Sequence, residues 1–149
     1  MSRILDGDNI RSGINSDLGF SEADRRENIR RIAEVCKLFT DTGIITLAAF
    51  VSPTSALRKL AREIVGKEHF FEIYVSTPLE ECERRDVKGL YAKARSGAIP
   101  EFTGITAPFE EPEHPELRLD TTHLSVEECV RRIVRAIMPI ISIDPKSRY

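Results

Sequence analysis

The sequence predicts an α/β fold in which a parallel sheet carries helices on both faces. Its 149 residues suffice for one domain with a sizeable core. Two observations predict the fold class. Strand-like apolar segments alternate with helical patterns, the order that builds parallel sheets. One of these segments, residues 44–51, is a continuous apolar run typical of a strand buried on both faces.

The first predicted strand is the short apolar run at residues 4–5, and two carboxylates flank a glycine directly after it, at residues 6–8. Open α/β folds bind their ligands at the carboxyl ends of strands. Arg11 and Arg25 add guanidinium groups suited to phosphate or sulfate oxygens, and Phe20 adds an aromatic face. Although Asp-Gly-Asp-Asn alone is typical of a turn, the combination predicts a nucleotide site with a metal ion.

A capped helix is predicted next. Ser21 is a good N-cap with Asp24 three residues on, and Gly43 is placed to end the helix. This puts Arg25 and Asn28 near the positive end of the helix dipole, which favours anions, although either could be a solvated residue of the helix surface. The inward stripe at helical spacing consists of Ile29, Ile32, Ala33 and Cys36.

The strand at 44–51 ends at Ser52-Pro53, and we expect the proline to open a helix over 53–65 that Gly66 ends. The residues expected inward are Leu57, Leu60, Ala61 and Ile64. A strand at 70–75 and a short helix beginning at residues 77–80 follow.

Near the C-terminus, residues 117–120 predict a strand, and Ser125 to Glu128 form a capping box for the last helix. Its expected inward residues are Val126, Val130, Ile133, Val134 and Ile137. Pro139 is expected to stop this helix, leaving residues 139–149 as a C-terminal tail able to add an edge strand.

Residues 86–116 break the alternation, with three glycines, four prolines and the cations Lys88, Lys93 and Arg95. A long loop-rich segment is usually a functional lid or a disordered linker. Three aromatic residues argue against plain disorder, so we predict a lid at 86–104.

Composition excludes several classes. The net charge of −2 gives no basic field for nucleic acid, no apolar run is long enough to cross a membrane, and no signal peptide is visible. The three cysteines are widely spaced, which favours buried thiols of a reducing cytoplasm.

The chain resembles the adenylylsulfate kinase family over residues 4–138. The resemblance is carried by residues 6–28 and by four further blocks, at 27–35, 51–53, 86–91 and 102–105. It implies a P-loop-kinase-like fold. The family's first strand–P-loop–helix unit is absent from this chain, since no G-x-x-x-x-G-K-[ST] run occurs in it. The resemblance places that strand between the strands at 44–51 and 70–75.

The implied activity is transfer of the ATP γ-phosphate, with Mg²⁺, to the 3′-hydroxyl of adenosine 5′-phosphosulfate, in sulfate assimilation. A homodimer is implied as well. The alternative is a catalytically inactive truncated fragment that only binds adenylylsulfate or associates with an intact subunit.

The resemblance also implies roles for single residues. Asp8 would accept the hydroxyl proton or hold Mg²⁺ through water, and Asp6 would support it. Ser52 matches a family serine, although capping the next helix would suffice as its role and a nucleophile there lacks an adjacent base. Arg85 resembles the residue that covers the ATP adenine.

Phe20 and Phe102 would sandwich the adenine of adenylylsulfate, although each could instead fill core. Glu101 stands where many members carry glycine. The residues implied for adenylylsulfate are Asp8, Asn9, Arg11, Asn15, Phe20, Arg25, Asn28, Val51, Ser52, Lys88, Leu90, Phe102 and Thr103. Those implied for ATP are Arg85, Lys93, Arg95 and Thr121. Taken singly, each of these lysine and arginine residues is also typical of a solvated surface charge.

Overall fold

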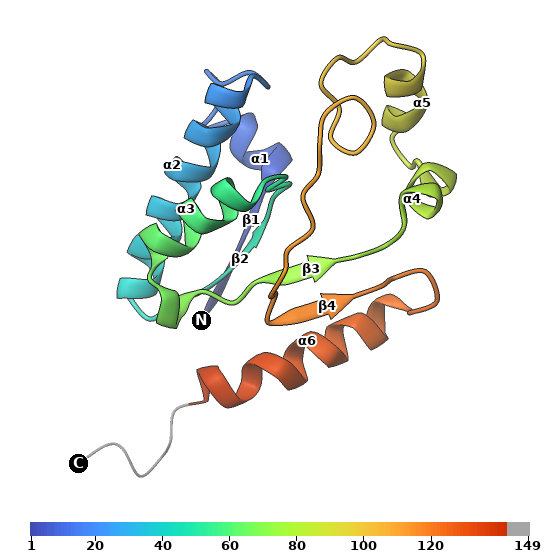
Figure 1. The fold of residues 1–149 in the computed structure, drawn as a ribbon. Coiled ribbons are helices and arrows are strands. Elements are labelled where there is room, and N and C mark those ends of the chain that lie inside the picture. Colours follow the sequence, from blue (N-terminus) through green and yellow to red (C-terminus); the bar gives the residue numbers. More distant parts are fainter. Residues whose placement is uncertain (143–149) are drawn as a thin grey trace, which may run out of the picture. The chain divides into compact units, whose positions relative to one another are not determined.

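The computed structural model describes residues 1–142, and Figure 1 labels their helices and strands. The contacts among these residues form two compact units. Unit 1 comprises residues 1–70 and 89–112, and unit 2 comprises residues 71–88 and those from 113 onward. Each unit is described by itself. Of the tail predicted at 139–149, residues 143–149 lie outside the described residues.

Unit 1 is built on two parallel strands. β1 (Ser2–Asp6) pairs with β2 (Ile45–Ala49) in a register that runs from Ser2↔Ile45 to Asp6↔Ala49. The long helix α2 packs on α3 and on β2. The helices of this unit are α1 (Gly7–Arg11), α2 (Glu22–Asp41), α3 (Ser55–Val65), a 3₁₀ turn (Lys67–His69) and α5 (Leu90–Arg95). Neither α1 nor α5 was predicted from the sequence.

The predicted core stripe of α2 is confirmed. Ile29, Ile32, Ala33 and Cys36 are all buried. Ser21 is the N-cap, and its hydroxyl accepts from the Asp24 N–H at 3.2 Å. Gly43 follows the last turn with φ of +75°, a conformation that glycine adopts without strain. Burial raises the pKa of the Cys36 thiol to about 11, which fits a packing role.

Two predictions for the region after α2 are wrong. The strand at 44–51 is not buried on both faces, since Leu47 is 46% exposed and β2 pairs with β1 alone among residues 1–142. Neither Ser52 nor Pro53 opens α3. Thr54 is the N-cap, and its side chain accepts from the Leu57 N–H. Of the four residues expected inward on this helix, Leu57 is buried and the others are half-buried.

Unit 2 holds the second strand pair, β3 (Ile73–Val75) parallel to β4 (Leu117–Leu119), with α4 (Leu79–Arg85) and α6 (Val126–Ile141). The described strands thus form two separate two-stranded parallel sheets, β1–β2 and β3–β4.

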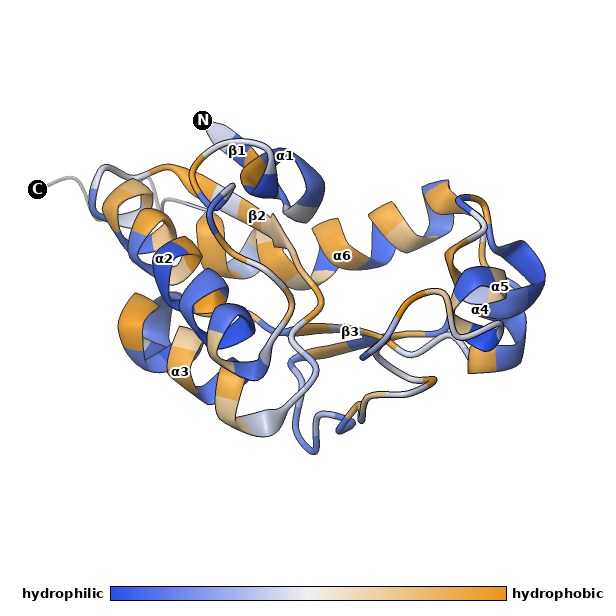
Figure 2. Ribbon diagram, turned by 90° about the horizontal axis from the view of Figure 1, so that it is seen from above, coloured by the Kyte–Doolittle hydropathy of each residue, from blue (hydrophilic) through white to orange (hydrophobic). Residues whose placement is uncertain are grey.

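The last helix begins at the predicted N-cap, but its predicted inward residues are not buried. Ser125 accepts from the Glu128 N–H at 3.2 Å, as the capping box requires. Val126, Val130 and Val134 were expected inward but are exposed, and no residue of α6 is fully buried, because no described element covers that side. Figure 2 shows hydrophobic residues recurring along this helix.

Pro139 does not stop α6, which runs to Ile141. In the last turn a proline removes a single intrahelical hydrogen bond, and Ser142 N–H still reaches the Met138 carbonyl at 3.0 Å. No helix of residues 1–142 is long and apolar enough to cross a membrane. Cys36, Cys82 and Cys129 are all free thiols.

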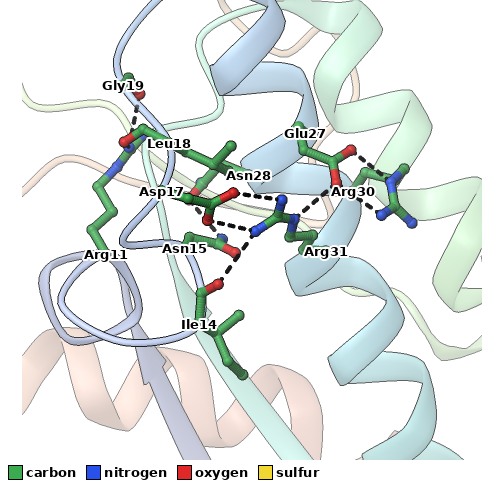
Figure 3. A network of polar contacts seen from close by, with 10 residues as sticks. All are labelled: Arg11, Ile14, Asn15, Asp17, Leu18, Gly19, Glu27, Asn28, Arg30 and Arg31. Carbon is green, nitrogen blue, oxygen red and sulfur yellow. Dashed lines mark hydrogen bonds and ion pairs between the residues drawn. The ribbon is translucent and has the colours of Figure 1, made fainter.

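An ion-pair network joins the loop after α1 to α2 (Figure 3). Arg31 donates to both carboxylate oxygens of Asp17, at 2.8 and 2.9 Å, and to Glu27 at 2.8 Å. Glu27 also accepts two bonds from Arg30. Hydrogen bonds from Arg30 and then Arg31 lower the pKa of Glu27 to about 2.

This network makes a prediction about pH. Because the pKa of Glu27 is lower in the folded protein than in the unfolded chain, its ion pairs stabilise the fold above the ordinary glutamate pKa, and this contribution disappears as the pH falls toward 2. We expect Glu27→Gln to lower the melting temperature at neutral pH. The difference from the parent should shrink as the pH is lowered from about 4.5.

The matched control is Glu34→Gln, whose carboxylate is half exposed and lies 3.8 Å from Arg30. An exposed pair of this kind contributes little, so thermal unfolding should change little at any pH. A constant difference between Glu27→Gln and the parent over this pH range would contradict the prediction.

Candidate functional site

The carboxyl end of β1 delivers the two aspartates predicted from the sequence. Asp6 is the N-cap of α1, and its Oδ1 accepts from the Asp8 N–H at 3.0 Å. Asp8 therefore sits in the first turn of α1, exposed to solvent. Because β2 lies parallel and in register with β1, the residues that follow β2, Val51 and Ser52, leave the sheet at the same edge.

Two buried amides fasten the loop after α1 to α2. Asn15 has no exposed surface, and its Nδ2 donates to the Oδ1 of Asn28 at 3.0 Å (Figure 3). The Asn15 Oδ1 has no partner among the described residues. Both residues were predicted to contact substrate. The structure shows Asn15 buried and bonded to the amide of Asn28.

Arg11 and Phe20 lie against one another. The guanidinium donates to the carbonyls of Leu18 and Gly19 at 3.2 and 2.8 Å, and its carbon lies 4.4 Å from the centre of the Phe20 ring, in cation–π range. Burial, followed by repulsion from Arg25, lowers the pKa of Arg11. The Phe20 side chain is 61% exposed, so it does not fill core.

Arg25 draws a distant loop into the same site. Its guanidinium donates to the carbonyl of Phe20 at 2.9 Å, to the carbonyl of Glu101 at 2.7 Å and to the hydroxyl of Thr103 at 3.2 Å. Between these last two residues, Phe102 is half-buried and meets Tyr91 edge to face, with 5.1 Å between ring centres. Unit 1 therefore brings together the acids, arginines and aromatic residues predicted for the acceptor.

The segment predicted as a lid, 86–104, is not all loop. It contains α5, which begins at Leu90, carries Lys93 and Arg95 in its last turn and buries Ala94. Lys88 belongs to unit 2, whereas α5 belongs to unit 1. Asn9, in α1, has an exposed side chain, and its carbonyl accepts from the Ser12 hydroxyl.

Unit 2 has a pocket of about 490 Å³ at the start of α6. Two residues predicted for ATP line it together, since Arg85 donates to the hydroxyl and to the carbonyl of Thr121, both at 2.8 Å. The other residues that line the pocket are Leu124, Ser125, Val126, Cys129 and Val130. The pocket thus pairs a guanidinium with a largely aliphatic wall.

The sequence did not single out the residues that hold this pair in place. Glu81 accepts from Arg85 Nε at 2.7 Å, and the hydroxyls of Thr77 and Thr121 lie 2.6 Å apart. Hydrogen bonds from Arg84 and then Arg85 lower the pKa of Glu81 to about 2. The i, i+4 spacing of Glu81 and Arg85 was a readable signal, whereas the threonine pair joins positions 44 residues apart.

Comparisons with known proteins agree on one family. A model of the family described as adenylylsulphate kinase matches residues 1–120. The adenylyl-sulfate kinase of Bacteroides thetaiotaomicron is 67% identical over 141 residues, which are 95% of this chain and 70% of that relative. The adenylyl-sulfate kinase of Geotalea uraniireducens is 60% identical over 134 residues, covering 90% of this chain and 64% of the relative.

Solved structures agree. The Mycobacterium tuberculosis APS kinase CysC, in complex with AMPPNP and APS, superposes with a TM-score of 0.85 at 47% identity, over 90% of this chain and 78% of that one. A hexameric APS kinase from Thiobacillus denitrificans gives a TM-score of 0.66 at 28% identity, over 93% of this chain and 22% of that one. From these matches, and from the P-loop-kinase-like α/β elements that carry the site, the chain belongs to the adenylylsulfate kinase family.

Proposed function

We propose that this protein transfers the ATP γ-phosphate to the 3′-hydroxyl of adenosine 5′-phosphosulfate, and that residues 6–28 together with the loop at 101–103 bind the acceptor. The observation that carries the proposal is the contact of one guanidinium, that of Arg25, with both phenylalanine-bearing segments. An exposed aromatic ring beside two arginines, as at Phe20, suits a purine nucleotide, which carries an aromatic base and an anionic phosphate end.

Asp8 is the proposed proton acceptor. The acceptor's 3′-oxygen forms a bond to the γ-phosphorus, the bond from that phosphorus to the β–γ bridging oxygen breaks, and ADP leaves. The hydroxyl proton passes to the Asp8 carboxylate. In support, α1 presents Asp8 one turn before Arg11, with Asp6 fixing the start of the turn. The Asp8 carboxylate would thus lie beside the acceptor.

Mg²⁺ accompanies ATP in this proposal and supplies neutralisation of phosphate charge. No group of three acidic, histidine or cysteine side chains able to hold a metal occurs among residues 1–142. A single carboxylate still suits Mg²⁺, which binds through one or two carboxylates, waters and substrate phosphates. Asp8, an exposed carboxylate at the sheet edge, is the residue that would hold it, through a water molecule.

The pocket of unit 2 is the proposed seat of the ATP adenine, with Arg85 and Thr121 as polar partners. Lys93 and Arg95 are proposed to contact the ATP phosphates. The remaining members of the acceptor set, proposed on the family resemblance, are Asn9, Val51, Ser52, Lys88, Leu90 and Thr103. Ser52 is free of the helix-capping role expected for it, because Thr54 has that role.

A homodimer in the cytoplasm completes the proposal. The free thiols of the described residues suit a reducing compartment. One relative with the same fold is described as hexameric, which supports self-association in general terms. Analytical ultracentrifugation of the purified protein would measure the oligomeric state directly.

The proposed role of Asp8 predicts a specific kinetic defect. The variants are made in a chain that also carries a G-x-x-x-x-G-K-[ST] segment. Asp8→Asn keeps the size of the side chain and removes its basicity, so kcat should fall by about 10²–10⁴ while the affinity for adenylylsulfate changes little. Asp41→Asn, which alters an exposed carboxylate at the far end of α2, is the matched control. The measurement is ADP release that depends on both nucleotides, and parent-like turnover by Asp8→Asn would exclude the proton-acceptor role.

A second candidate function, binding without catalysis, is favoured for a polypeptide limited to these 149 residues. They contain no G-x-x-x-x-G-K-[ST] run, whose backbone amides and lysine hold ATP phosphates. Each of the four described strands also has one edge without a partner strand. The absent run favours the view that these residues do not hold the ATP phosphates by themselves.

We therefore expect residues 1–149 alone to give no measurable 3′-phosphorylated product. Loss of one oxyanion-type donor costs about 2.7–4 kcal/mol, and the phosphate cradle comprises several. The measurement is a coupled assay of ADP release at saturating ATP and adenylylsulfate. Turnover at about 1 s⁻¹ or faster, the range of ordinary kinases, would show that another segment binds the ATP phosphates.

A further inference from the structure

Arg25 contacts both of the segments that carry the phenylalanines of the proposed adenine site. Its Nε donates to the Phe20 carbonyl. Its Nη2 and Nη1 donate to the Glu101 carbonyl and the Thr103 hydroxyl, which lie 76 and 78 residues away in sequence. One guanidinium therefore joins two segments that the chain itself keeps far apart.

The loop that Arg25 contacts has a backbone conformation that favours glycine. Glu101 has φ of +53°, a left-handed conformation at a residue that is not glycine. This left-handed region crowds the Cβ atom of an L-residue, so it persists where surrounding contacts hold it. The 2.7 Å bond from Arg25 to the carbonyl of the same residue is such a contact.

Beyond residue 101 the loop is held together by its own hydrogen bonds. The Phe102 N–H donates to the Thr106 hydroxyl at 2.8 Å, and the Phe102 carbonyl accepts from three N–H groups, those of Ile105, Thr106 and Ala107. Residues 102–107 therefore form a rigid piece. The two bonds from Arg25 fix where that piece lies relative to Phe20.

We propose that Arg25 is a positioning residue for the purine, which sets the spacing of Phe20 and Phe102 in addition to any contact with an anion. The inference rests on the proposed function, because the purine in question is that of the acceptor. A guanidinium has five N–H donors in a planar fork. Three of them reach protein acceptors here, which leaves two for a phosphate or sulfate oxygen.

The experiment separates the purine from the anion by using adenosine, which has the base and ribose without the phosphosulfate. Adenosine and adenylylsulfate are titrated calorimetrically into the full chain and into Arg25→Lys. Lysine keeps the charge but not the planar fork. We expect Arg25→Lys to weaken adenosine binding about tenfold and adenylylsulfate binding at least as much.

Arg26→Lys is the matched control. Arg26 is the next residue of α2 and is exposed, and both adenosine and adenylylsulfate should bind this variant as they bind the parent. Thr103→Val is the second variant, since it removes one acceptor of the link and leaves every charge in place. It should weaken adenosine binding less than Arg25→Lys does.

Hydrogen exchange gives a readout that a general loss of stability would not reproduce. In Arg25→Lys and Thr103→Val, the amides of residues 102–107 should exchange faster, while those of α2 from residue 30 onward keep their parent rates. Unchanged adenosine affinity in Arg25→Lys, with weakened adenylylsulfate, would overturn the inference and leave Arg25 as an anion contact alone. A parent protein that binds neither ligand would overturn the proposed function and the inference with it.

Discussion

The fork between Arg31 and Asp17 is the interaction on which the geometry of the proposed acceptor site depends. Arg31 donates to both Asp17 oxygens, to Glu27 and to the Ile14 carbonyl, so a single side chain of α2 anchors the loop that leaves α1. Such two-pronged contacts fix orientation as well as distance. Each ion pair is partly exposed, so it contributes little to stability. Its contribution is to fix the position of the loop along the helix.

The other contacts of the site continue from this anchor toward the N-terminus of α2. The buried pair of Asn15 and Asn28 continues the attachment toward the helix start. Just before the start of α2, the Arg11 guanidinium donates hydrogen bonds to the carbonyls of residues 18 and 19. Phe20 is thereby held at the N-terminus of α2, within reach of Arg25. The proposed acceptor site is thus assembled on one long, well-packed helix, which fits the general need for binding groups to stand on rigid elements.

The predictions from the sequence were most accurate for features that depend on residues close together in the chain. The stripe of α2 and the caps at Ser21 and Ser125 depend on spacings of three or four residues, and all are confirmed. Burial depends on what covers a surface, so the exposure of β2 and of α6 could not be read from periodicity. The same limit applies to the site: Arg25 was singled out as a cation, while its bonds to residues 101 and 103 join positions that no local pattern relates.

The unpaired strand edges have a further consequence, for the behaviour of a polypeptide made of these residues alone. β2 reads Ile-Thr-Leu-Ala-Ala, carries no charge or proline, and has one edge without a partner strand among residues 1–142. Natural sheets protect such edges with lysine, proline or bulges, because an open apolar edge is a template for pairing with another molecule. Together with the exposed valines of α6, this edge should make solubility, more than folding speed, the limit on handling the isolated polypeptide.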